Sequence, residues 1–396
     1  MHIGIVTTWF ERGAAYVSRQ YQKLFQASGH TVSIYARGGE KYATGDATWD
    51  TEDVTWGKHA EIPNPAAIDM QDFFLWIRKK RLDCIVFNEQ TWWPPLFWAR
   101  LLGVKTVAYV DYYTEETVPL FGAYDALLCN TKRHYSVFSW HPQCLYVPWG
   151  TDISVFTPRW KSPSEEERVF FHSAGMNPWR KGTDLVLSAF SQLDCTHTNP
   201  WKLIIHTQKS LDTLPNVSQL IARLQNEGRL EVFEQDVTAP GLYHLGDVYV
   251  YPSRLDGIGL TVAEALACGL PVILPDNPPM NEFLYPSAGT AVPLHRLWSR
   301  RDGYYWPQCE VSVRELAHAM QNYVETSDLR AKQEAARACA ETHLDWMKNA
   351  SHVGTWIAHL QSIPFSDAVL SFAYTIFKNE PALFRQLIQR QNLCRA

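Results

Sequence analysis

Residues 254–274 read RLDGIGLTVAEALACGLPVIL, the most informative part of the chain for its fold class. It follows an apolar run at residues 248–251, which is typical of a buried strand, and it predicts a helix over residues 260–268. Between them, Gly257 and Gly259 allow the backbone to approach a ligand closely. The order strand, glycine turn, helix and further apolar strand is the repeating unit of a parallel α/β sheet.

The start of this helix is also a candidate binding site. Free N–H groups and the positive end of the helix dipole suit a phosphate or another oxygen-rich ligand. Asp256 lies in the turn, and Glu264 lies one turn inside the helix, where it can reach hydroxyl groups above the helix end. The alternative is an ordinary strand–turn–helix whose glycines serve tight packing.

The same alternation of strands and helices extends outward in both directions. We expect strands at residues 2–7, 31–35, 83–87, 105–110, 125–129 and 144–148, and again at 169–174, 203–207, 230–233, 248–251, 271–275 and 290–293. Helical spacing separates them, for example over residues 15–27 and 183–193. This pattern predicts two doubly wound α/β domains, in which ligands bind at the carboxyl ends of the strands.

Domain boundaries follow from composition. Residues 157–166, TPRWKSPSEE, are rich in proline, serine and charge, as linkers are. We therefore expect domains at residues 1–156 and 157–345, followed by helices in residues 346–396 that pack across the domain interface.

Four segments, taken together, resemble the large retaining glycosyltransferase family with the GT-B fold, called family 4. Residues 254–274 resemble its E-x7-E signature, with Asp256 in place of the first glutamate and Glu264 as the second. Residues 147–158, 175–182 and 242–253 resemble the interdomain segment, the G-R-x-x-x-x-K-G loop and the segment before the signature. Lys181 matches the lysine of that loop, whereas Met176 occupies its arginine position. The resemblance covers most of residues 1–345.

The resemblance implies two Rossmann-like domains facing across a cleft, and a hexosyltransferase that uses a nucleotide sugar and retains the anomeric configuration. Relatives commonly use a UDP-hexose. The donor is a co-substrate, and no further cofactor is implied. No D-x-D sequence occurs, so we expect no required metal. Lys181, with the neighbouring Arg180, would neutralise the leaving diphosphate.

The resemblance also implies roles for further residues. Glu264 would accept hydrogen bonds from the ribose, and Asp256 would hold hydroxyls of the donor sugar. The remaining donor-binding candidates are backbone or turn positions: Gly13, Gly257, Ile258, Gly259, Leu260 and Thr261. On the acceptor side we expect Asn88, Glu89 and Tyr112, with Asp111 replacing a histidine that the family often places there. A purely structural role is the alternative for each of these.

The acceptor stays open among a glycan, a lipid-linked sugar, a small molecule and a modified nucleic acid base. With 36 basic and 41 acidic residues, the net charge of −5 disfavours stable nucleic acid binding. Two other classes of function remain: another enzyme of the same fold, such as a phosphorylase or a nucleotide-sugar epimerase, and a catalytically silent binding or scaffold subunit. Met176 and Asp256 depart from the motifs of the family, so the catalytically silent subunit remains an alternative.

Targeting signals are not evident. The N-terminal MHIGIVTTWF has no basic region or cleavage site of a secretory leader, and no apolar run is long enough to span a bilayer. We expect a cytoplasmic protein with eight unpaired cysteines. The basic run RKKR at residues 78–81 either places cations at the negative end of a helix dipole, which stabilises the helix, or contacts a membrane surface.

Overall fold

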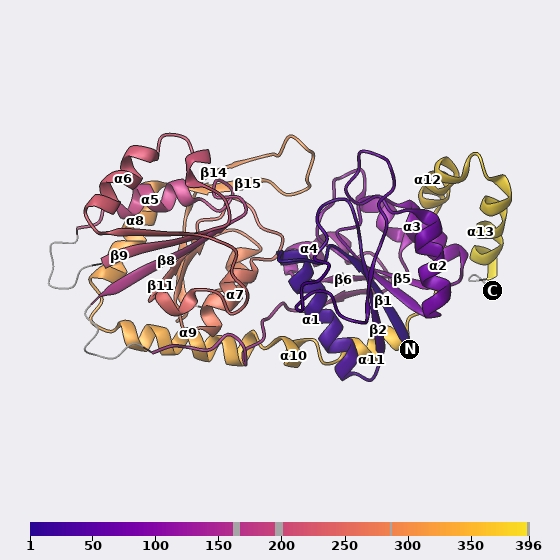
Figure 1. The fold of residues 1–396 in the computed structure, drawn as a ribbon, viewed down its shortest axis with the longest axis horizontal. Coiled ribbons are helices and arrows are strands. Elements are labelled where there is room, and N and C mark those ends of the chain that lie inside the picture. The colour runs from indigo at the N-terminus through magenta and orange to yellow at the C-terminus, as the bar shows by residue number, and fades with distance from the viewer. Residues whose placement is uncertain (161–166, 195–200, 286, 394–396) are drawn as a thin grey trace. The chain divides into compact units, whose positions relative to one another are not determined.

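A computed structural model describes residues 1–160, 167–194, 201–285 and 287–393, and these form two compact units (Figure 1). The first unit contains Met1–Pro148 and Ala350–Ala396, and the second contains Trp149–Asn349. The chain therefore passes between the units near residues 148 and 349, whereas we expected boundaries at 156 and 345. Of the expected linker, residues 161–166 lie outside the described part of the chain.

Backbone and side-chain contacts explain the difference at both boundaries. Thr151 forms a β-bridge with Asp345, and Arg337 donates hydrogen bonds to the carbonyls of Ile153 and Phe156. Trp149 and Trp346 pack with their ring centroids 4.7 Å apart. These pairings attach residues 149–156 and 346–349 to the second unit.

The first unit is built on a seven-stranded parallel sheet with the order β3-β2-β1-β4-β5-β6-β7. Its strands are β1 (His2–Thr7), β2 (Thr31–Ala36), β3 (Val54–Trp56), β4 (Cys84–Asn88), β5 (Lys105–Tyr109), β6 (Ala126–Cys129) and β7 (Cys144–Tyr146). The central strands are buried along almost their whole length, because helices cover both faces of the sheet. Ile5 lies between Ile34 and Val86 in this register. The structure confirms the six expected strands and adds the short β3, whose residues are only half-buried.

The helices of the first unit come from both ends of the chain. They are α1 (Gly13–Ala27), α2 (Met70–Lys80), α3 (Pro94–Leu101), α4 (Lys132–Phe138), α11 (Val353–Ala358), α12 (Asp367–Phe377) and α13 (Pro381–Leu393), with the short 3-10 helix η1 (Val118–Ala123). The basic run ends α2: Arg78, Lys79 and Lys80 lie in its last turn.

The helical tail predicted from the sequence is present as α12 and α13, and it covers aromatic side chains of the first unit. Trp93 and Phe97 pack on Phe372 of α12, with ring centroids 5.8 and 6.1 Å apart. The buried Arg100 forms an ion pair with Asp125 and donates to the carbonyl of Ile363. Residues 350–396 are thus an integral part of the first unit.

The second unit is built on a six-stranded parallel sheet with the order β10-β9-β8-β11-β12-β13. Its strands are β8 (Arg168–Gly175), β9 (Trp201–Thr207), β10 (Leu230–Glu234), β11 (Val248–Val250), β12 (Val272–Pro275) and β13 (Gly289–Val292). Its helices are α5 (Thr183–Phe190), α6 (Ser218–Asn226), α7 (Leu260–Ala267), α8 (Val313–Val324), α9 (Leu329–His343) and α10 (Trp346–Asn349), with the short η2 (Leu211–Thr213), η3 (Tyr243–Leu245) and η4 (Met280–Phe283). Every expected strand of this half is present.

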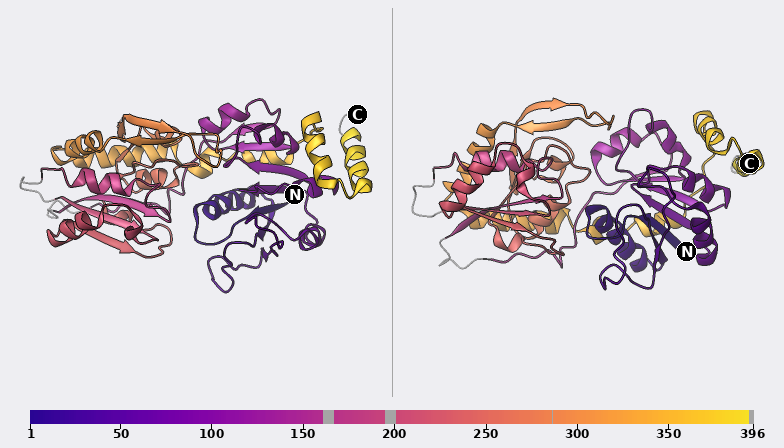
Figure 2. Two further views of the ribbon diagram at one scale, coloured as in Figure 1. Left: turned by 90° about the horizontal axis from the view of Figure 1, so that it is seen from above. Right: turned by 45° about the horizontal axis from the view of Figure 1, so that its top comes forward.

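One element of the second unit was not expected from the sequence. The strands β14 (Leu294–Trp298) and β15 (Gln308–Val311) form an antiparallel hairpin outside the six-stranded sheet (Figure 2). The last strand that the sequence predicts ends at residue 293.

Two further expectations concern membranes and cysteines. No helix in the described ranges has both the length and the apolar character needed to cross a bilayer. The six cysteines of the described part of the chain, Cys84, Cys129, Cys144, Cys268, Cys309 and Cys339, are free thiols. Cys195 and Cys394 lie outside the described residues.

Candidate active site

The loop between β8 and α5 presents the predicted phosphate-binding cations. Gly182 ends this loop as the N-cap of α5 with φ +74°, a left-handed conformation that favours glycine. A Cβ atom at this position would lie 2.3 Å from the carbonyl oxygen of Pro252, which is the second residue after β11. The close approach of the two backbones brings Arg180 and Lys181 next to the residues that follow β11.

Lys181, Arg180 and Asp256 form one cluster with Tyr251. The ammonium of Lys181 forms an ion pair with Asp256 and donates to the hydroxyl of Tyr251, and this hydroxyl donates to the same carboxylate. Arg180 Nη1 lies 3.4 Å from Asp256 Oδ2 and donates to the carbonyl of Leu255 at 2.8 Å. The structure thus brings together three of the predicted site residues and adds Tyr251.

The electrostatics of this cluster follow from burial and charge. Burial lowers the pKa of Lys181 to about 8, against the opposing effect of Asp256. Burial alone would raise the pKa of Asp256, but the charges of Lys181 and Arg180 outweigh it and hold this pKa below its ordinary value. Asp256 is therefore a carboxylate at neutral pH, and Lys181 is close to the pH at which it loses its charge.

The structure confirms the glycine turn and the helix start that the sequence predicted before α7. Gly259 is the N-cap of α7 with φ +91°, and its N–H donates to Asp256 Oδ1 at 3.3 Å. Glu264 lies one turn into the helix, where its carboxylate accepts a hydrogen bond from Tyr243 at 2.6 Å. The remaining predicted donor residues of this half surround that helix start: Gly257, Ile258, Leu260 and Thr261.

Arg254 connects the segments that form this site, although no motif in the sequence identified it. Its nearly buried guanidinium donates to both oxygens of Asp184 at 2.7 Å, to Glu310 of β15 at 2.8 Å and to the carbonyl of Trp179. It also lies over the Trp179 ring, 4.6 Å from the centroid. One side chain therefore links the cation loop, α5, the turn at Asp256 and the hairpin.

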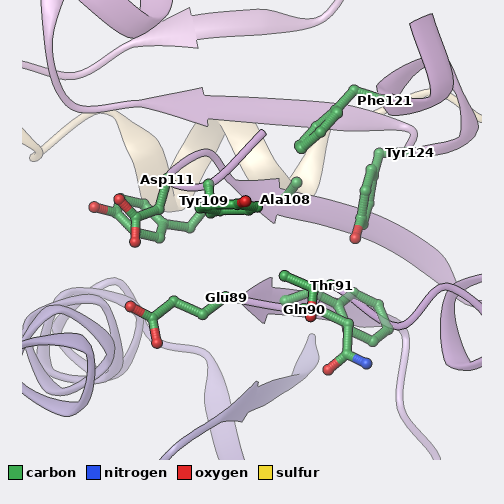
Figure 3. A pocket seen from close by; sticks show the side chains of 10 residues that line it. Glu89, Gln90, Thr91, Ala108, Tyr109, Asp111, Phe121 and Tyr124 are labelled. Carbon is green, nitrogen blue, oxygen red and sulfur yellow. The ribbon is translucent and has the colours of Figure 1, made fainter. Parts of the chain in front are cut away.

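Most of the acceptor-side candidates line a pocket in the first unit, at the carboxyl ends of β4 and β5 (Figure 3). Its lining consists of Phe87, Glu89, Gln90, Thr91, Ala108, Tyr109, Asp111, Tyr112, Phe121 and Tyr124. Three of the four acceptor-side predictions, Glu89, Asp111 and Tyr112, are among them.

The loop that carries Glu89 has a strained backbone, and the buried Arg37 holds it in place. Glu89 has φ +51°, which is unusual for a residue other than glycine and is often associated with functional sites. Arg37 donates to the carbonyls of Asn88 and Glu89 and to the side chain of Gln90 at 3.3, 3.0 and 2.9 Å. Arg12 Nη2 lies 3.3 Å from the Glu89 carboxylate.

Two candidates lie outside the pocket lining. Asn88 is buried, and its amide donates to Ala14 and Ser18, which connects β4 to α1. Gly13 is the first residue of α1 and is exposed.

Two histidines lie within strands of the second unit, and their ring nitrogens contact groups of the protein itself. His172 is fully buried between the carbonyl of Val250 and the hydroxyl of Thr183, and burial lowers its pKa to about 4. His206 contacts the carbonyl of Gln235 at 2.9 Å. Among the residues that the structure describes, no group of three or more His, Cys, Asp or Glu side chains is arranged to hold a metal ion.

Sequence reasoning missed Tyr251, Tyr243 and Arg254 because their roles depend on partners distant in the chain. A partial signal exists for one of them. Tyr249 and Tyr251 are two residues apart at the end of a strand, so their rings project from the same face and stack at 5.6 Å.

Comparison with known proteins supports a glycosyltransferase of the GT-B type. Residues 156–335 match the family model described as glycosyl transferases group 1. A GDP-mannose-dependent monoacylated alpha-(1-6)-phosphatidylinositol monomannoside mannosyltransferase of Corynebacterium glutamicum is 27% identical over 181 residues. The match covers 41% of this chain and 46% of the relative, so the chain spans about half the length of that protein. The O-antigen chain mannosyltransferase B of Escherichia coli is 31% identical over 112 residues, which is 26% of this chain and 29% of the relative.

Solved structures resemble the chain over nearly its whole length. Sucrose-phosphate synthase from Thermosynechococcus elongatus aligns with a TM-score of 0.69 at 16% identity, covering 90% of this chain and 98% of that one. The Anabaena protein HepE in complex with UDP and glucose aligns with a TM-score of 0.66 at 16% identity, covering 91% and 99%. At this level of identity the likeness shows the fold, and it confirms two Rossmann-like α/β domains of the GT-B type.

Proposed function

We propose that the chain transfers a hexose from a nucleotide sugar to a hydroxyl group of an acceptor, with retention of the anomeric configuration and without a required metal. The observation that carries the proposal is the convergence of Lys181, Arg180 and Asp256 beside the starts of α5 and α7. Two cations and two helix N-termini suit a diphosphate, and carboxylates next to them suit sugar hydroxyls.

The proposed roles in donor binding follow from this arrangement. Lys181 and Arg180 bind the diphosphate and stabilise its charge as it leaves, which is the contribution that a metal ion makes in other enzymes. Glu264 accepts hydrogen bonds from the ribose. Asp256 holds hydroxyls of the donor sugar, together with the N–H groups at residues 258–260. Gly257 and Thr261 complete the proposed donor contacts within the second unit.

In the proposed reaction the bond between the anomeric carbon and the diphosphate oxygen breaks, and a bond from the acceptor oxygen to that carbon forms on the same face. The proton of the acceptor hydroxyl passes to the departing diphosphate. Retention rests on the resemblance to family 4, since a fold alone does not decide stereochemistry. Asp111 is the proposed hydrogen-bond partner of the reacting sugar on the acceptor side.

Donor base and acceptor are proposals of the same kind. UDP is the expected base, and the UDP complex of the structurally similar Anabaena protein supports it, whereas the name of the C. glutamicum relative specifies GDP-mannose. A glycan or a lipid-linked sugar is the proposed acceptor, because the names of that relative and of the E. coli protein specify such acceptors. We propose a cytoplasmic location, where the basic end of α2 would contact an anionic membrane surface.

The proposal is tested by donor turnover. The protein is incubated with UDP-, GDP- and ADP-hexoses, with and without chelator, and release of the nucleoside diphosphate is measured over time. We expect release from one donor, unchanged by chelator and strongly reduced in Glu264→Ala. Binding of a nucleotide without any release would instead favour a silent binding subunit, and loss of release with chelator would contradict the metal-independent mechanism.

A further inference from the structure

We infer that Tyr243 is a positioning residue that holds the Glu264 carboxylate in place for a ribose, and that it thereby sets a preference of the site for ribonucleotides over 2′-deoxyribonucleotides. The inference rests on the proposed function, which assigns the ribose to Glu264, and it adds a residue that no motif in the sequence identifies. It is carried by the hydrogen bond between the two side chains, by the burial of the phenol and by the packing of the segment around it.

A short hydrogen bond to a charged group joins the two side chains. The hydroxyl of Tyr243 donates to Glu264 Oε2 at 2.6 Å. A hydrogen bond from a hydroxyl to a carboxylate is roughly twice as strong as one between neutral groups. A carboxylate can accept about four hydrogen bonds, so the single bond from the phenol orients Glu264 and does not by itself occupy the group.

Burial fixes the direction of this hydrogen bond. Tyr243 is buried, and its burial together with the nearby charge of Glu264 raises the pKa of the phenol well above its ordinary value. The phenol therefore keeps its proton at neutral pH and donates it toward the carboxylate. Glu264 itself is only half-buried, so a ligand above the start of α7 can reach it.

The segment that carries Tyr243 is tightly packed within the second unit. The ring of Tyr243 contacts three aromatic side chains, Phe156, Phe171 and Tyr249, with centroids 6.1, 5.6 and 5.8 Å away. A Cβ atom at Gly246, directly after η3, would lie 2.6 Å from the Cβ atom of Phe171 in β8. The phenol is therefore held on a rigid support.

This support prepares Glu264 for binding before a ligand arrives. A glutamate side chain has several rotatable bonds, and fixing them costs conformational entropy. In the free protein the bond from Tyr243 already restricts them, so a ribose would not have to order the carboxylate. Removal of the phenol hydroxyl would take away this restriction and leave the charge of Glu264 in place.

A fixed carboxylate favours ribose over deoxyribose. Ribose presents neighbouring 2′ and 3′ hydroxyls, whereas deoxyribose presents the 3′ hydroxyl alone. A hydrogen bond to a charged group contributes roughly tenfold or more in affinity, so a site built for both hydroxyls disfavours the ligand that lacks one. A carboxylate that can turn away forms both bonds less often, and the difference between the two ligands then becomes smaller.

The inference is tested with the full chain by calorimetric titration of UDP, GDP and ADP and of the corresponding 2′-deoxynucleoside diphosphates. We expect the ribonucleotide that binds to do so about tenfold more tightly than its deoxy counterpart. Tyr243→Phe keeps the ring and removes the hydroxyl, so it should weaken the ribonucleotide and reduce this ratio to about threefold or less. The matched control is Tyr323→Phe, which removes the hydroxyl of another buried tyrosine, 3.4 Å from the hydroxyl of Thr290, and should leave the ratio unchanged.

Two further variants separate a positioning role from a purely structural one. In a protein that already carries Glu264→Ala, Tyr243→Phe should have no further effect on ribonucleotide affinity, because the phenol acts through the carboxylate that is missing. Glu264→Asp keeps the charge but shortens the side chain that the phenol holds, so it should also reduce the ratio. This last measurement tests the inference even if Tyr243→Phe does not fold.

Four results would overturn the inference: an unchanged ratio in Tyr243→Phe, equal effects of that substitution with and without Glu264, a full ratio in Glu264→Asp, or equal binding of the two ligands by the wild type. In each of these cases a nucleoside diphosphate still binds, so the transferase itself remains standing. If the wild type binds none of the nucleoside diphosphates, the proposed function and the inference are both overturned.

Discussion

At the scale of single residues, the site of the second unit depends on how Lys181 is partnered. Asp256 is one methylene shorter than the glutamate of the family 4 signature, and in the free protein it pairs with Lys181 and Tyr251. A donor diphosphate would therefore join a cluster in which the lysine charge is already partly neutralised. Burial disfavours the charged form of the ammonium, so the pKa of Lys181 is lowered to about 8.

This lowered pKa predicts a pH dependence of nucleotide binding. Lys181 carries its charge below about pH 8 and loses it as the pH rises through that value, so affinity for a nucleoside diphosphate should fall between pH 7 and 9.5. If only the charged form binds, the fall approaches tenfold per pH unit well above the pKa. Titrations at several pH values measure it. Lys181→Arg keeps the cation and should flatten the profile, and a wild-type affinity that stays constant to pH 9.5 would contradict the role of Lys181.

Arg254 gives a prediction for stability. Arg254→Gln leaves Asp184 and Glu310 without their shared guanidinium in a largely buried setting, so the free energy of unfolding should fall by about 3 kcal/mol. Denaturant unfolding measures this loss. The control is Arg330→Gln, which breaks the exposed pair with Glu334 and should cost less than about 1 kcal/mol. Equal losses in the two variants would show that Arg254 does not organise the site.

At this scale the motif residues stand out in the sequence, whereas the residues that contact them do not. Lys181, Asp256 and Glu264 stand out because glycines and short spacings accompany them. Tyr243 and Arg254 gain their importance only when the fold brings Glu264 and Glu310 to them. No local pattern in the sequence carries that information.

At the scale of elements, two helices of the second unit begin at glycines with left-handed backbones, Gly182 and Gly259. In the proposed function both helix starts bind the diphosphate, so the position of each helix would matter for binding as well as for packing.

Substitution of Gly182 separates backbone strain from close packing. In Gly182→Ala the new Cβ would have an unfavourable φ and would also meet the Pro252 carbonyl at 2.3 Å. Gly228 has a similar φ of +69° but open space around the added atom, so Gly228→Ala should cost only about 1 kcal/mol. Thermal unfolding and nucleotide titration of both variants measure the difference. We expect Gly182→Ala to lose more stability than Gly228→Ala, and only Gly182→Ala to bind nucleotide more weakly. Equal stability and equal nucleotide affinity in the two variants would contradict the packing argument.

Most strands and helices were predictable because their apolar runs have the lengths and spacings of buried elements. The exceptions have physical reasons. The strand β3 is short and only half-buried, so it lacks an apolar run. The strands β14 and β15 read LHRLW and QCEV, with Leu297 exposed and the charged Arg296 and Glu310 within them, so their pattern is that of a loop.

At the scale of the whole molecule, the first unit combines the two ends of the chain. Its aromatic core continues from Trp93 and Phe97 to Phe365 and Phe372 of the C-terminal part. Composition alone could not show this, because helices in residues 346–396 are equally compatible with packing on either half. The exact boundaries were also beyond the sequence, since they depend on single contacts such as Thr151 with Asp345.

Removal of residues 362–396 tests this assignment. The truncation takes away Phe365 and Phe372, exposes Phe97 and deprives Arg100 of the Ile363 carbonyl, so the first unit should lose several kcal/mol of stability. Hydrogen exchange followed by mass spectrometry resolves the two units separately. Protection should fall in residues 1–148 and persist in 201–285, and equal loss in both would contradict the assignment of the tail to the first unit.

The central claim is that the cluster of Lys181, Arg180 and Asp256 binds the diphosphate of a nucleotide sugar. The most direct test is titration of UDP, GDP and ADP into the wild-type protein and into Lys181→Met at pH 7. We predict saturable binding of one nucleotide by the wild type and at least tenfold weaker binding by a folded variant. Absence of binding for all three nucleotides, or equal affinity in the variant, would contradict the claim.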